Sequence, residues 1–354
     1  MGIFVLFFIL YTDFKGIWIP RWSITDHSKI LACLDGKFNH IFLQVFALGE
    51  AYYPSKYAPS KMRSDTWLKE FLDEAHRREI KVSAWINALY SWGYAPRTFN
   101  QKHPINRNPG WYVRDQYERS ILDYTVGELK QIGVEGYFLS PAHSEARSYI
   151  IKLIEEIIHN YDFDGLHLDY IRYPSGTFIY DVHLRSKFMK KYYFDPKDLG
   201  ERSFLKERLG IWGYNDLTHQ WHEFVNNDLT GFIRDVTKHV KTIKPDLLVS
   251  VAVKPNYGAA RHRFHQDWLQ WLNFGLVDFV CLMAYDKNIE MDLAELLEVV
   301  EEPHRVTVGL GLYLLSPKKI KEQVHLVNTF PYAGVVFFSY EELKRNRRYL
   351  NSLK

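Results

Sequence analysis

Short apolar segments and longer amphipathic segments alternate along nearly the whole 354-residue chain. The apolar segments are rich in β-branched and aromatic residues, so we expect them to be β-strands. The expected strands lie at residues 16–20, 39–47, 80–88, within 161–174, and at 247–254, 277–285, 306–312 and 334–339. The expected helices lie at residues 25–34, 65–79, 145–160, 216–244, 265–274, 293–300, 317–327 and from 341 onward. Eight strands that alternate with helices predict an α/β fold, a single (β/α)8 barrel over residues 16–354.

A doubly wound open sheet is the alternative α/β architecture, but it would need a glycine-rich phosphate loop after an early strand, and none is present. Two long insertions, residues 89–140 and 175–215, interrupt the alternation. We expect short strands around Tyr112 and Ile121 in the first insertion, whereas the second is basic and aromatic. Long loops in compact domains tend to be functional, so both are candidates for a role in binding.

Residues 161–174 contain the most informative pattern of residue types. Two leucines face one side of the expected strand, whereas His167 and Asp169 face the other. Asp164 precedes the strand in a turn, about 16 Å from Asp169, so the two acids cannot form one catalytic pair. Asp169 lies at the carboxyl end of the strand, where active sites of barrels are found. It is therefore our candidate for the chemistry.

The other expected strands also carry one aliphatic face and one small, polar or aromatic face. The residues of the second kind are Trp18, Gln44, Asn87, Lys254, Tyr285, Gly309, Gly311 and Ser339. A closed barrel explains this division, because helices cover one face and the other faces the barrel interior. The polar members cluster toward the carboxyl ends of their strands, as a catalytic interpretation requires.

The composition narrows the class of function. Aromatic residues make up 16% of the chain, which fits either a large aromatic core or a groove whose rings stack on sugars. A net charge of +3 is too small and scattered to indicate a nucleic-acid partner. With only Cys33 and Cys281, the chain has neither a disulfide framework nor a zinc pattern, and we expect no metal and no cofactor.

The N-terminus has a continuously apolar stretch at residues 3–10, within a segment (1–15) that could be the remnant of an export signal or anchor. The stretch is too short to span a bilayer, and it lacks a basic flank and a cleavage site. An incorrect start site, an uncleaved membrane anchor and an extra buried strand are the alternatives. We favour a clipped export signal and therefore an extracytoplasmic location, secreted or attached to the envelope.

Six short segments form an ordered set of motifs along the chain. They are Gly-Ile-Trp-Ile at 16–19; Gln-Val-Phe-Ala-Leu-Gly-Glu-Ala-Tyr-Tyr at 44–53, with Pro-Ser at 59–60; Phe-Asp-Gly-Leu-His-Leu-Asp-Tyr at 163–170; Gln-Asp-Trp-Leu-Gln-Trp-Leu at 266–272; Gly-Leu-Val-Asp-Phe-Val-Cys-Leu-Met-Ala-Tyr at 275–285; and Gly-Val-Val-Phe-Phe-Ser-Tyr at 334–340. Together these motifs resemble those of the glycosyl-hydrolase-like family 10. The resemblance covers residues 16–340 and implies a TIM barrel and a glycosidase of cell-envelope or extracellular polysaccharide. Phe46 and Glu50 stand where the family usually has Arg and Asp, and the loss of an arginine would alter the preferred substrate charge.

A fainter resemblance links the chain to chitinase-type barrels of glycoside hydrolase family 18. Met283, Tyr285 and Asp286 match the motif of their sixth strand. Where those enzymes have the catalytic glutamate of the fourth strand, however, this chain has Ile171. This departure argues against the family-18 mechanism and leaves Asp169 as the only acid at the end of the fourth strand.

Glycoside hydrolysis needs an acid that protonates the leaving oxygen and a second carboxylate, or a substrate amide, that stabilises the cationic centre. Asp169 is the expected acid, or alternatively a brace for His167 or Arg172. Asp286 and Glu50 are the candidates for the second carboxylate, although Asp286 could cap a helix and Glu50 could simply be solvated. The expected substrate-binding residues are Trp18, Trp22, Gln44, Tyr53, Trp85, Asn87, His167, Arg172, Lys254 and Tyr285. Trp92 is a further candidate for stacking on a sugar ring. The alternative for each of the tryptophans and for Tyr53 is a place in the hydrophobic core. The alternative for His167 is a buried histidine with no role in binding.

We therefore expect a glycosidase whose partner is an oligo- or polysaccharide, with an amino-sugar polymer as the favoured substrate. The competing function is a non-catalytic, carbohydrate-binding barrel, which shared fold alone does not exclude. A polysaccharide deacetylase would need a cluster of His and Asp metal ligands, which the sequence does not offer.

Overall fold

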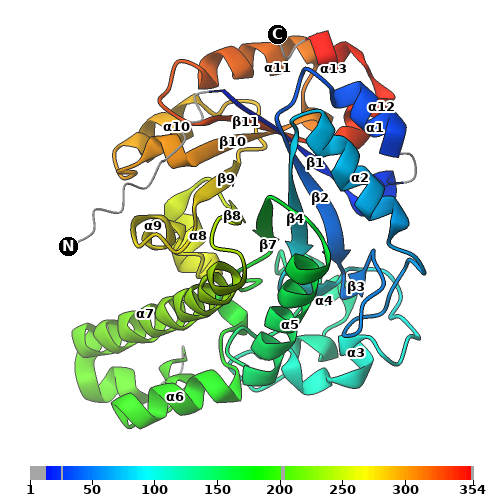
Figure 1. Ribbon diagram of the computed structural model, residues 1–354. Helices are drawn as coiled ribbons and strands as arrows, with labels where there is room; N and C mark the ends of the chain where they lie inside the picture. The colour runs from blue at the N-terminus through cyan, green and yellow to red at the C-terminus, as the bar shows by residue number, and fades with distance from the viewer. Residues whose placement is uncertain (1–12, 25–26, 201–203, 352–354) are drawn as a thin grey trace, which may run out of the picture.

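The computed structural model describes residues 13–24, 27–200 and 204–351. Its centre is a closed barrel of parallel strands, because β1 pairs with both β2 and β11 (Figure 1). The barrel strands are β1 (Phe14–Ile19), β2 (His40–Ala47), β4 (Lys81–Asn87), β7 (Gly165–Asp169), β8 (Leu248–Val253), β9 (Phe279–Met283), β10 (Val306–Gly311) and β11 (Gly334–Phe338). The predicted (β/α)8 barrel is confirmed. The apolar stretch at residues 3–10 and residues 25–26, where the first helix is expected to begin, lie outside the described residues.

Helices connect successive strands and cover the outside of the barrel. They are α1 (His27–Leu34), α2 (Thr66–Arg77), α5 (Ser144–Asn160), α7 (Phe204–Ile243), α8 (Tyr257–Phe264), α9 (Trp268–Asn273), α10 (Glu290–Leu297), α11 (Pro317–Val327), α12 (Tyr340–Arg345) and α13 (Arg348–Asn351). One large apolar cluster fills the layer between these helices and the outward faces of the strands. In α2, for example, Leu68, Phe71, Leu72 and Ala75 are buried at the spacing of a single helix face.

The barrel interior is a second, smaller core. Its apolar members are Phe14, Trp18, Phe42, Trp85, Phe279, Cys281, Ala333 and Val336. Gly309 makes room for the largest of them, since a Cβ atom there would lie 2.9 Å from the indole of Trp18 and 2.5 Å from the carbonyl of Leu282. The same interior holds His40, which hydrogen-bonds Ser83 at 2.8 Å, and burial together with the charge of Lys81 lowers the pKa of His40 to about 3.

The first insertion has less regular structure than expected. Its strands are β5 (Tyr90–Trp92) and β6 (Tyr137–Phe138), with the short helices α3 (Pro104–Arg107) and α4 (Val126–Gln131) between them. Tyr112 forms only an isolated bridge with Leu139, and Ile121 begins a 3-10 turn because Ser120 and Asp123 cap it. The prediction of strands around Tyr112 and Ile121 is therefore wrong. The insertion does contain two paired strands, but they are β5 and β6.

Two expected helices differ from those observed. α7 begins at Phe204 rather than 216, with a non-helical Gly210 (φ 67°) that divides it into two helices. The segment expected to be one helix at 265–274 contains only α9, because His265 adopts a left-handed conformation (φ 55°) that ends α8. The second insertion contributes α6 (Val182–Tyr192), whose C-cap Tyr193 is also left-handed.

A bulge in β2 interrupts the alternation of its side chains, so Phe46 does not face the same side as Phe42 and Gln44. The register of β2 against β4 passes from the pair Gln44–Trp85 to the pair Phe46–Ile86, which leaves one residue of β2 unmatched. Phe42 therefore lies inside the barrel, whereas Phe46 packs in the outer core and not on the same face. Just beyond, β3 (Glu50–Ala51) folds back antiparallel to the end of β2.

Candidate active site

Asp169 ends strand β7 at the carboxyl mouth of the barrel, directly beside Asn87 at the end of β4. Its carboxylate accepts hydrogen bonds from the indole N–H of Trp85 (3.2 Å) and the backbone N–H of Tyr170 (2.7 Å). Burial raises the pKa of Asp169 to about 6, although these two donors and the charge of Arg172 oppose the shift. An acid with this pKa can hold a proton close to neutral pH, as a general acid must.

Asp164 lies at the other end of the same strand. Its carboxylate accepts from the backbone N–H of Val82 (2.7 Å) and lies 2.9 Å from Nε2 of His76. The expected separation of Asp164 from Asp169 is thus confirmed, and Asp164 joins β4 and α2 to the amino end of the barrel.

A second acid at the mouth, Glu135, was missed by the sequence reasoning. Its carboxylate receives a 2.5 Å hydrogen bond from Arg172 and lies 3.9 Å from Nζ of Lys254. Burial alone would raise the pKa of Glu135, but the charges of Arg172 and Lys254 outweigh it, and the pKa is lowered. Asp169 is within electrostatic range, since the charge of Glu135 contributes to the raised pKa of Asp169. The mouth therefore holds two acids whose pKa values are shifted in opposite directions.

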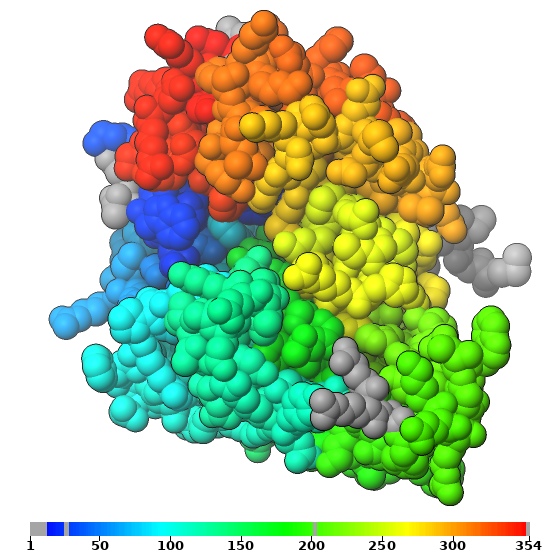
Figure 2. Space-filling view, turned by 180° about the vertical axis from the view of Figure 1, so that it is seen from behind, coloured from blue at the N-terminus to red at the C-terminus, as the bar shows by residue number. Residues whose placement is uncertain are grey.

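The first insertion brings Glu135 to this place. Gly136 has φ +152°, and a Cβ atom there would lie 2.3 Å from the carbonyl of Trp92, so only glycine allows the close approach of β5 and β6. Tyr90 fixes the same turn by donating to the carbonyl of Glu135 at 3.0 Å. Figure 2 shows this insertion, in cyan and teal, meeting the green and yellow segments that contain Arg172 and Lys254. The one sequence signal was an acid next to a glycine in a long aromatic insertion.

Arg172 is buried rather than part of a surface salt bridge. Its guanidinium lies over the rings of Tyr170 (5.0 Å), Phe138 (5.6 Å) and Phe264 (4.9 Å). Tyr170 has a left-handed backbone (φ 53°) and stacks on Tyr90 at 4.4 Å between ring centroids. These rings hold Arg172 with its charge directed at Glu135.

Lys254, which follows β8, forms the next part of this charged wall. It lies 5.2 Å from the ring of Phe264, and burial followed by the charge of Arg172 lowers the pKa of Lys254. The alternative in which Asp169 braces His167 does not occur. His167 instead accepts from the indole of Trp18 (3.1 Å), and its other ring nitrogen lies 2.9 Å from the hydroxyl of Ser250.

An aromatic wall forms part of the mouth at the ends of β9, β10 and β11. Tyr285 lies 5.5 Å from Phe338 and 6.1 Å from Tyr313, measured between ring centroids. Burial and then the charge of Asp169 raise the pKa of Tyr285 well above its usual value, which places Tyr285 near the acid. Tyr313, on the 3-10 turn after β10, is 52% exposed and was not predicted. Such a wall offers flat faces to a ligand with flat apolar faces.

Gln44 and Asn87 are joined at the ends of β2 and β4. The side-chain amide of Gln44 donates to Asn87 at 3.1 Å, and its oxygen accepts two bonds of 3.2 Å from Arg21. Arg21 in turn lies over Trp22, which is 55% exposed. Gln44 and Asn87 are thus buried at the strand ends, whereas Trp22 is exposed beside them, and their role in binding stays a prediction.

The two acids expected as partners of Asp169 have other contacts. Glu50, in β3, is nearly buried and forms an ion pair with Lys61 at 2.9 Å. Asp286 is exposed, and its carboxylate accepts from the backbone N–H of Asn288 at 3.2 Å. This bond closes a local turn and does not cap α10, whose N-cap residue is Ile289. The charge of Glu135, by contrast, contributes to the raised pKa of Asp169.

Several predicted binding residues lie inside the packed protein. Tyr53 and His167 are fully buried and Trp18 is 2% exposed, so the core alternative fits all three. Trp85 lies beneath the mouth and contacts Asp169. Trp92 belongs to the first insertion, where it donates to the carbonyl of Ala95 at 3.1 Å.

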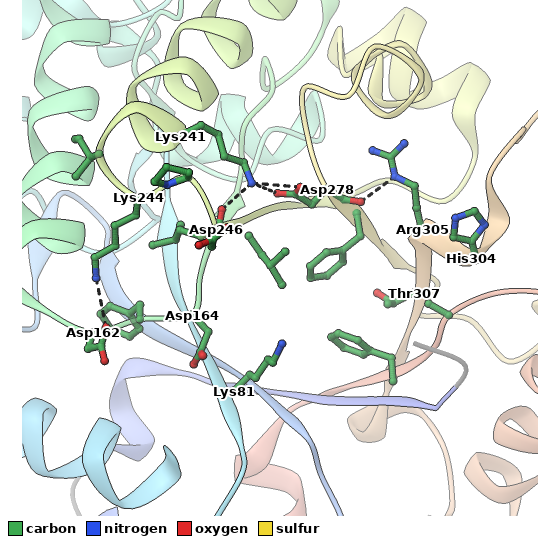
Figure 3. Close-up of a pocket in the computed structure, with 18 residues that line it drawn as sticks. Lys81, Asp162, Asp164, Lys241, Lys244, Asp246, Asp278, His304, Arg305 and Thr307 are labelled. Carbon is green, nitrogen blue, oxygen red and sulfur yellow. Dashed lines mark hydrogen bonds and ion pairs between the residues drawn. The ribbon is translucent and has the colours of Figure 1, made fainter. Parts of the chain in front are cut away.

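A cavity of about 770 Å³ opens at the opposite, amino end of the barrel (Figure 3). Its charges are largely paired within the chain: Lys241 contacts Asp278 at 3.0 Å, and Lys244 contacts Asp162 at 3.5 Å. Figure 3 shows Lys241 directed at Asp278 and Lys244 directed at Asp162. Phe14 and Phe279 are among the apolar residues that line the cavity. Since residues at this end of such barrels serve stability, we place the active site at the other end.

Among the residues that the structure describes, no group of three or more His, Cys, Asp or Glu side chains is arranged to hold a metal ion. No helix in the described ranges is long and apolar enough to cross a membrane.

Comparison with known proteins gives relatives of the same kind. The chain is 23% identical over 290 residues to the glycosyl hydrolase DigH of Escherichia coli, an alignment that covers 73% of this chain and 56% of DigH. It is 24% identical over 260 residues to an S-layer-related protein of Niallia circulans, which covers 69% of this chain and 15% of that protein. The chain thus spans about half or less of the length of these relatives.

Solved structures with the same fold cover nearly the whole chain. The glycoside hydrolase domain of PgaB (BpsB) from Bordetella bronchiseptica superposes with a TM-score of 0.71 at 16% identity, covering 96% of this chain and 98% of that domain. A family-18 chitinase from Cycas revoluta in complex with (GlcNAc)3 superposes with a TM-score of 0.53 at 14% identity, covering 97% and 100%. These similarities support the barrel fold.

The model of one protein family, glycosyl hydrolase-like 10, matches residues 15–323. This range includes every barrel strand except β11 and the start of β1, and it contains Asp169, Glu135, Arg172 and Lys254. The chain belongs to the glycosyl hydrolase-like 10 family.

Proposed function

We propose that the protein is a glycoside hydrolase that cleaves an extracellular or cell-envelope polysaccharide, with amino-sugar polymers as the favoured substrates. Asp169 is the general acid and Glu135 is the second carboxylate. The observation that carries this assignment is that both acids lie at the carboxyl mouth with pKa values shifted apart, Asp169 upward and Glu135 downward. Family membership supports the reaction class, and the GlcNAc oligomer bound by the Cycas chitinase supports the sugar class.

The chemistry follows from these two protonation states. Protonated Asp169 gives its proton to the glycosidic oxygen while the bond from that oxygen to the anomeric carbon breaks. Positive charge then develops on the sugar ring, and ionised Glu135 stabilises it or deprotonates the water that attacks the anomeric carbon. Arg172 and Lys254 keep Glu135 ionised, because their charges favour the carboxylate.

The two walls of the mouth suit a sugar ligand. Tyr285, Tyr313 and Phe338 offer ring faces, whereas Lys254, Gln44 and Asn87 offer polar atoms for hydroxyl, carboxylate or amide groups. Binding across both walls would place the scissile bond beside Asp169.

An extracytoplasmic location is part of this proposal. It rests on the apolar stretch at residues 3–10 and on the relative described as S-layer-related. Fractionation of cells that express the full chain tests it, since recovery only with cytoplasmic marker proteins would contradict it.

The direct test is a reducing-end assay of the purified chain on chitin oligomers, peptidoglycan glycan strands and uncharged β-glucans. We expect new reducing ends from at least one amino-sugar polymer, and their loss in D169N and E135Q. Turnover that persists in both variants would remove this site from the reaction.

A non-catalytic, carbohydrate-binding barrel is the second candidate. One observation favours it: Glu135 is already held by Arg172 and Lys254, so the mouth could be a static binding surface. Glycan-array binding in parallel with the reducing-end assay separates the two functions. Tight binding of a glycan that is never cleaved supports the binding barrel.

A further inference from the structure

The second insertion forms an arm that the catalytic proposal does not use. We define the basic arm as residues 182–200 and 204–212, which comprise α6, the segment after it and the first turns of α7. Figure 1 shows α6 at the edge of the molecule, on the side of α7 away from the barrel. We propose that the basic arm docks on the surface of an anionic lipid bilayer.

The second insertion carries an excess of positive charge. Residues 175–215 contain eight Lys or Arg against five Asp or Glu, a net of +3, which equals the net charge of the entire chain. Lys190 and Arg208 are exposed and form no ion pair within the part of the chain that the structure describes. Lys191 lies over Tyr192 at 5.1 Å and Lys206 over Tyr214 at 5.7 Å. The remaining described cations of the arm, Arg185, Lys187 and Lys197, form ion pairs within the chain. An anionic surface complements this excess of positive charge.

Large apolar side chains are exposed among these cations. They are Val182 (56% exposed), Met189 (42%), Tyr193 (91%), Phe204 (55%), Leu209 (45%), Ile211 (56%) and Trp212 (86%). Val182, Met189 and Tyr193 follow one another at intervals of seven and four residues, so they share one face of α6 and its cap. The opposite face of α6 buries Leu184 and Phe188 against the protein. An exposed apolar face of this kind marks a contact surface.

The base of the arm is held firmly. Phe188 packs edge-on against Trp221 (5.0 Å) and Phe224 (5.3 Å) of α7, and Arg185 forms ion pairs with Asp195 and Glu118. Beyond this base, Gly210 (φ 67°) turns the chain, so the short helix at 204–209 takes its own direction before Ile211 and Trp212. The exposed apolar side chains of the arm are therefore already held in a folded segment before any binding.

The chemistry of the surface favours lipid over two other occupants. A second copy of the chain would oppose one positively charged arm to another, which is repulsive. A polysaccharide would use flat aromatic platforms, but Val182, Leu209 and Ile211 are aliphatic. Tryptophan and aliphatic side chains flanked by Lys and Arg are the composition of segments that lie in the interface of a bilayer.

The test is co-sedimentation of the full chain with vesicles of phosphatidylcholine alone or mixed with phosphatidylglycerol. We expect binding only to the anionic vesicles, weakened by salt, and reduced about tenfold or more in I211S/W212S and in K190E/R208E. The matched control is F99S, because Phe99 is 94% exposed but lies in the other insertion. The control should bind like the unmodified chain, and all variants should melt at the same temperature.

Three outcomes would overturn the proposal. One is the absence of binding to anionic vesicles. Another is binding that I211S/W212S and K190E/R208E leave unchanged, which would assign it to residues 3–10 or to another surface. The third is a dimer, seen by analytical ultracentrifugation, that these substitutions dissociate. None of these outcomes depends on glycosidase activity, so failure here leaves the proposed function standing.

Discussion

Arg172 donates a 2.5 Å hydrogen bond to Glu135, which joins the segment after strand β7 to the first insertion. Asp169 and Arg172 are three residues apart in the chain, so this bond also fixes Glu135 relative to the candidate acid. The three side chains form one electrostatic unit: the positive charge of Arg172 lowers the pKa of Asp169, and the negative charge of Glu135 raises it. The contact between the two segments thus brings Glu135 close enough to Asp169 for the two to be a candidate acid–carboxylate pair.

Replacing Asp169 tests the acid directly. Asn keeps the volume and one acceptor oxygen but has no proton to donate, so turnover should fall about 100- to 10,000-fold in D169N. Its melting temperature should change little. D164N is the matched control, since Asp164 belongs to the same strand but lies at the amino end. We expect D164N to lose about 1–3 kcal/mol of stability and to keep its turnover per folded molecule.

If Asp169 were instead a structural brace, the pattern would be reversed. D169N would then melt early and retain most of its turnover, and Asp169 would leave the list of catalytic residues.

The pH profile should report the raised pKa of Asp169. The acid must be protonated to work, so kcat/KM should fall about tenfold per pH unit above pH 6. The folded protein binds this proton more tightly than the unfolded chain does. The contribution of Asp169 to stability is therefore complete at low pH and is lost as pH rises through about 6. In D169N, neither the residual kcat/KM nor the melting temperature should show this change near pH 6. A fall of kcat/KM above pH 6 that persists in D169N would show that another group titrates there.

Removing the charge of Glu135 should change both rate and profile. E135Q keeps the shape of the side chain but cannot stabilise a cationic sugar, so turnover should fall at least about 100-fold. The basic limb of kcat/KM should also move to lower pH, because Glu135 raises the pKa of Asp169. E50Q and D286N are the controls, and each should retain turnover within a few-fold. A large loss in either control together with an active E135Q would restore the second carboxylate to the residue expected from sequence.

The strand pattern predicted the barrel and the position of Asp169 because both depend on local chemistry. Alternation along β7 determines which side of the barrel each residue faces, and the position of Asp169 at the strand end follows from the chain order alone. No contact with a distant segment is needed for either inference.

Glu135 and Tyr313 could not be found in this way. Glu135 reaches the mouth through the pairing of β5 with β6 and through Gly136, and Tyr313 reaches it on a turn after β10. Their positions depend on how loops pack against the barrel. The periodic spacing of apolar residues along strands and helices carries no information about that packing. The bulge in β2 could not be predicted from alternation either. Strict alternation with Phe42 would place Phe46 inside the barrel, but one unmatched residue puts it in the outer core.

Tyr313 should contribute to binding rather than to the chemical step. Its ring is half-exposed and forms the outer part of the aromatic wall with Tyr285 and Phe338. Removing a stacking ring weakens the substrate complex and the transition state alike, so Y313A should raise KM about five- to tenfold with kcat nearly unchanged. Y117A, at an 85% exposed tyrosine outside the wall, should leave both constants as they are. A fall in kcat alone would instead indicate that Tyr313 acts in the transition state.

His40 should make the fold sensitive to acid. The pKa of this buried ring is about 3, far below that of the same histidine in the unfolded chain, because burial and the charge of Lys81 disfavour its cation. The unfolded state therefore binds the proton first, and stability should fall as pH drops from about 6.5 toward 3, by about 1.4 kcal/mol per pH unit. His167, whose pKa is also lowered by burial, adds to the slope. Melting temperatures measured across this window should decline less steeply for H40N than for the unmodified chain, whereas H239N, at a largely exposed position, should follow the unmodified slope. Equal slopes in all three proteins would mean that His40 is not held neutral in the barrel interior.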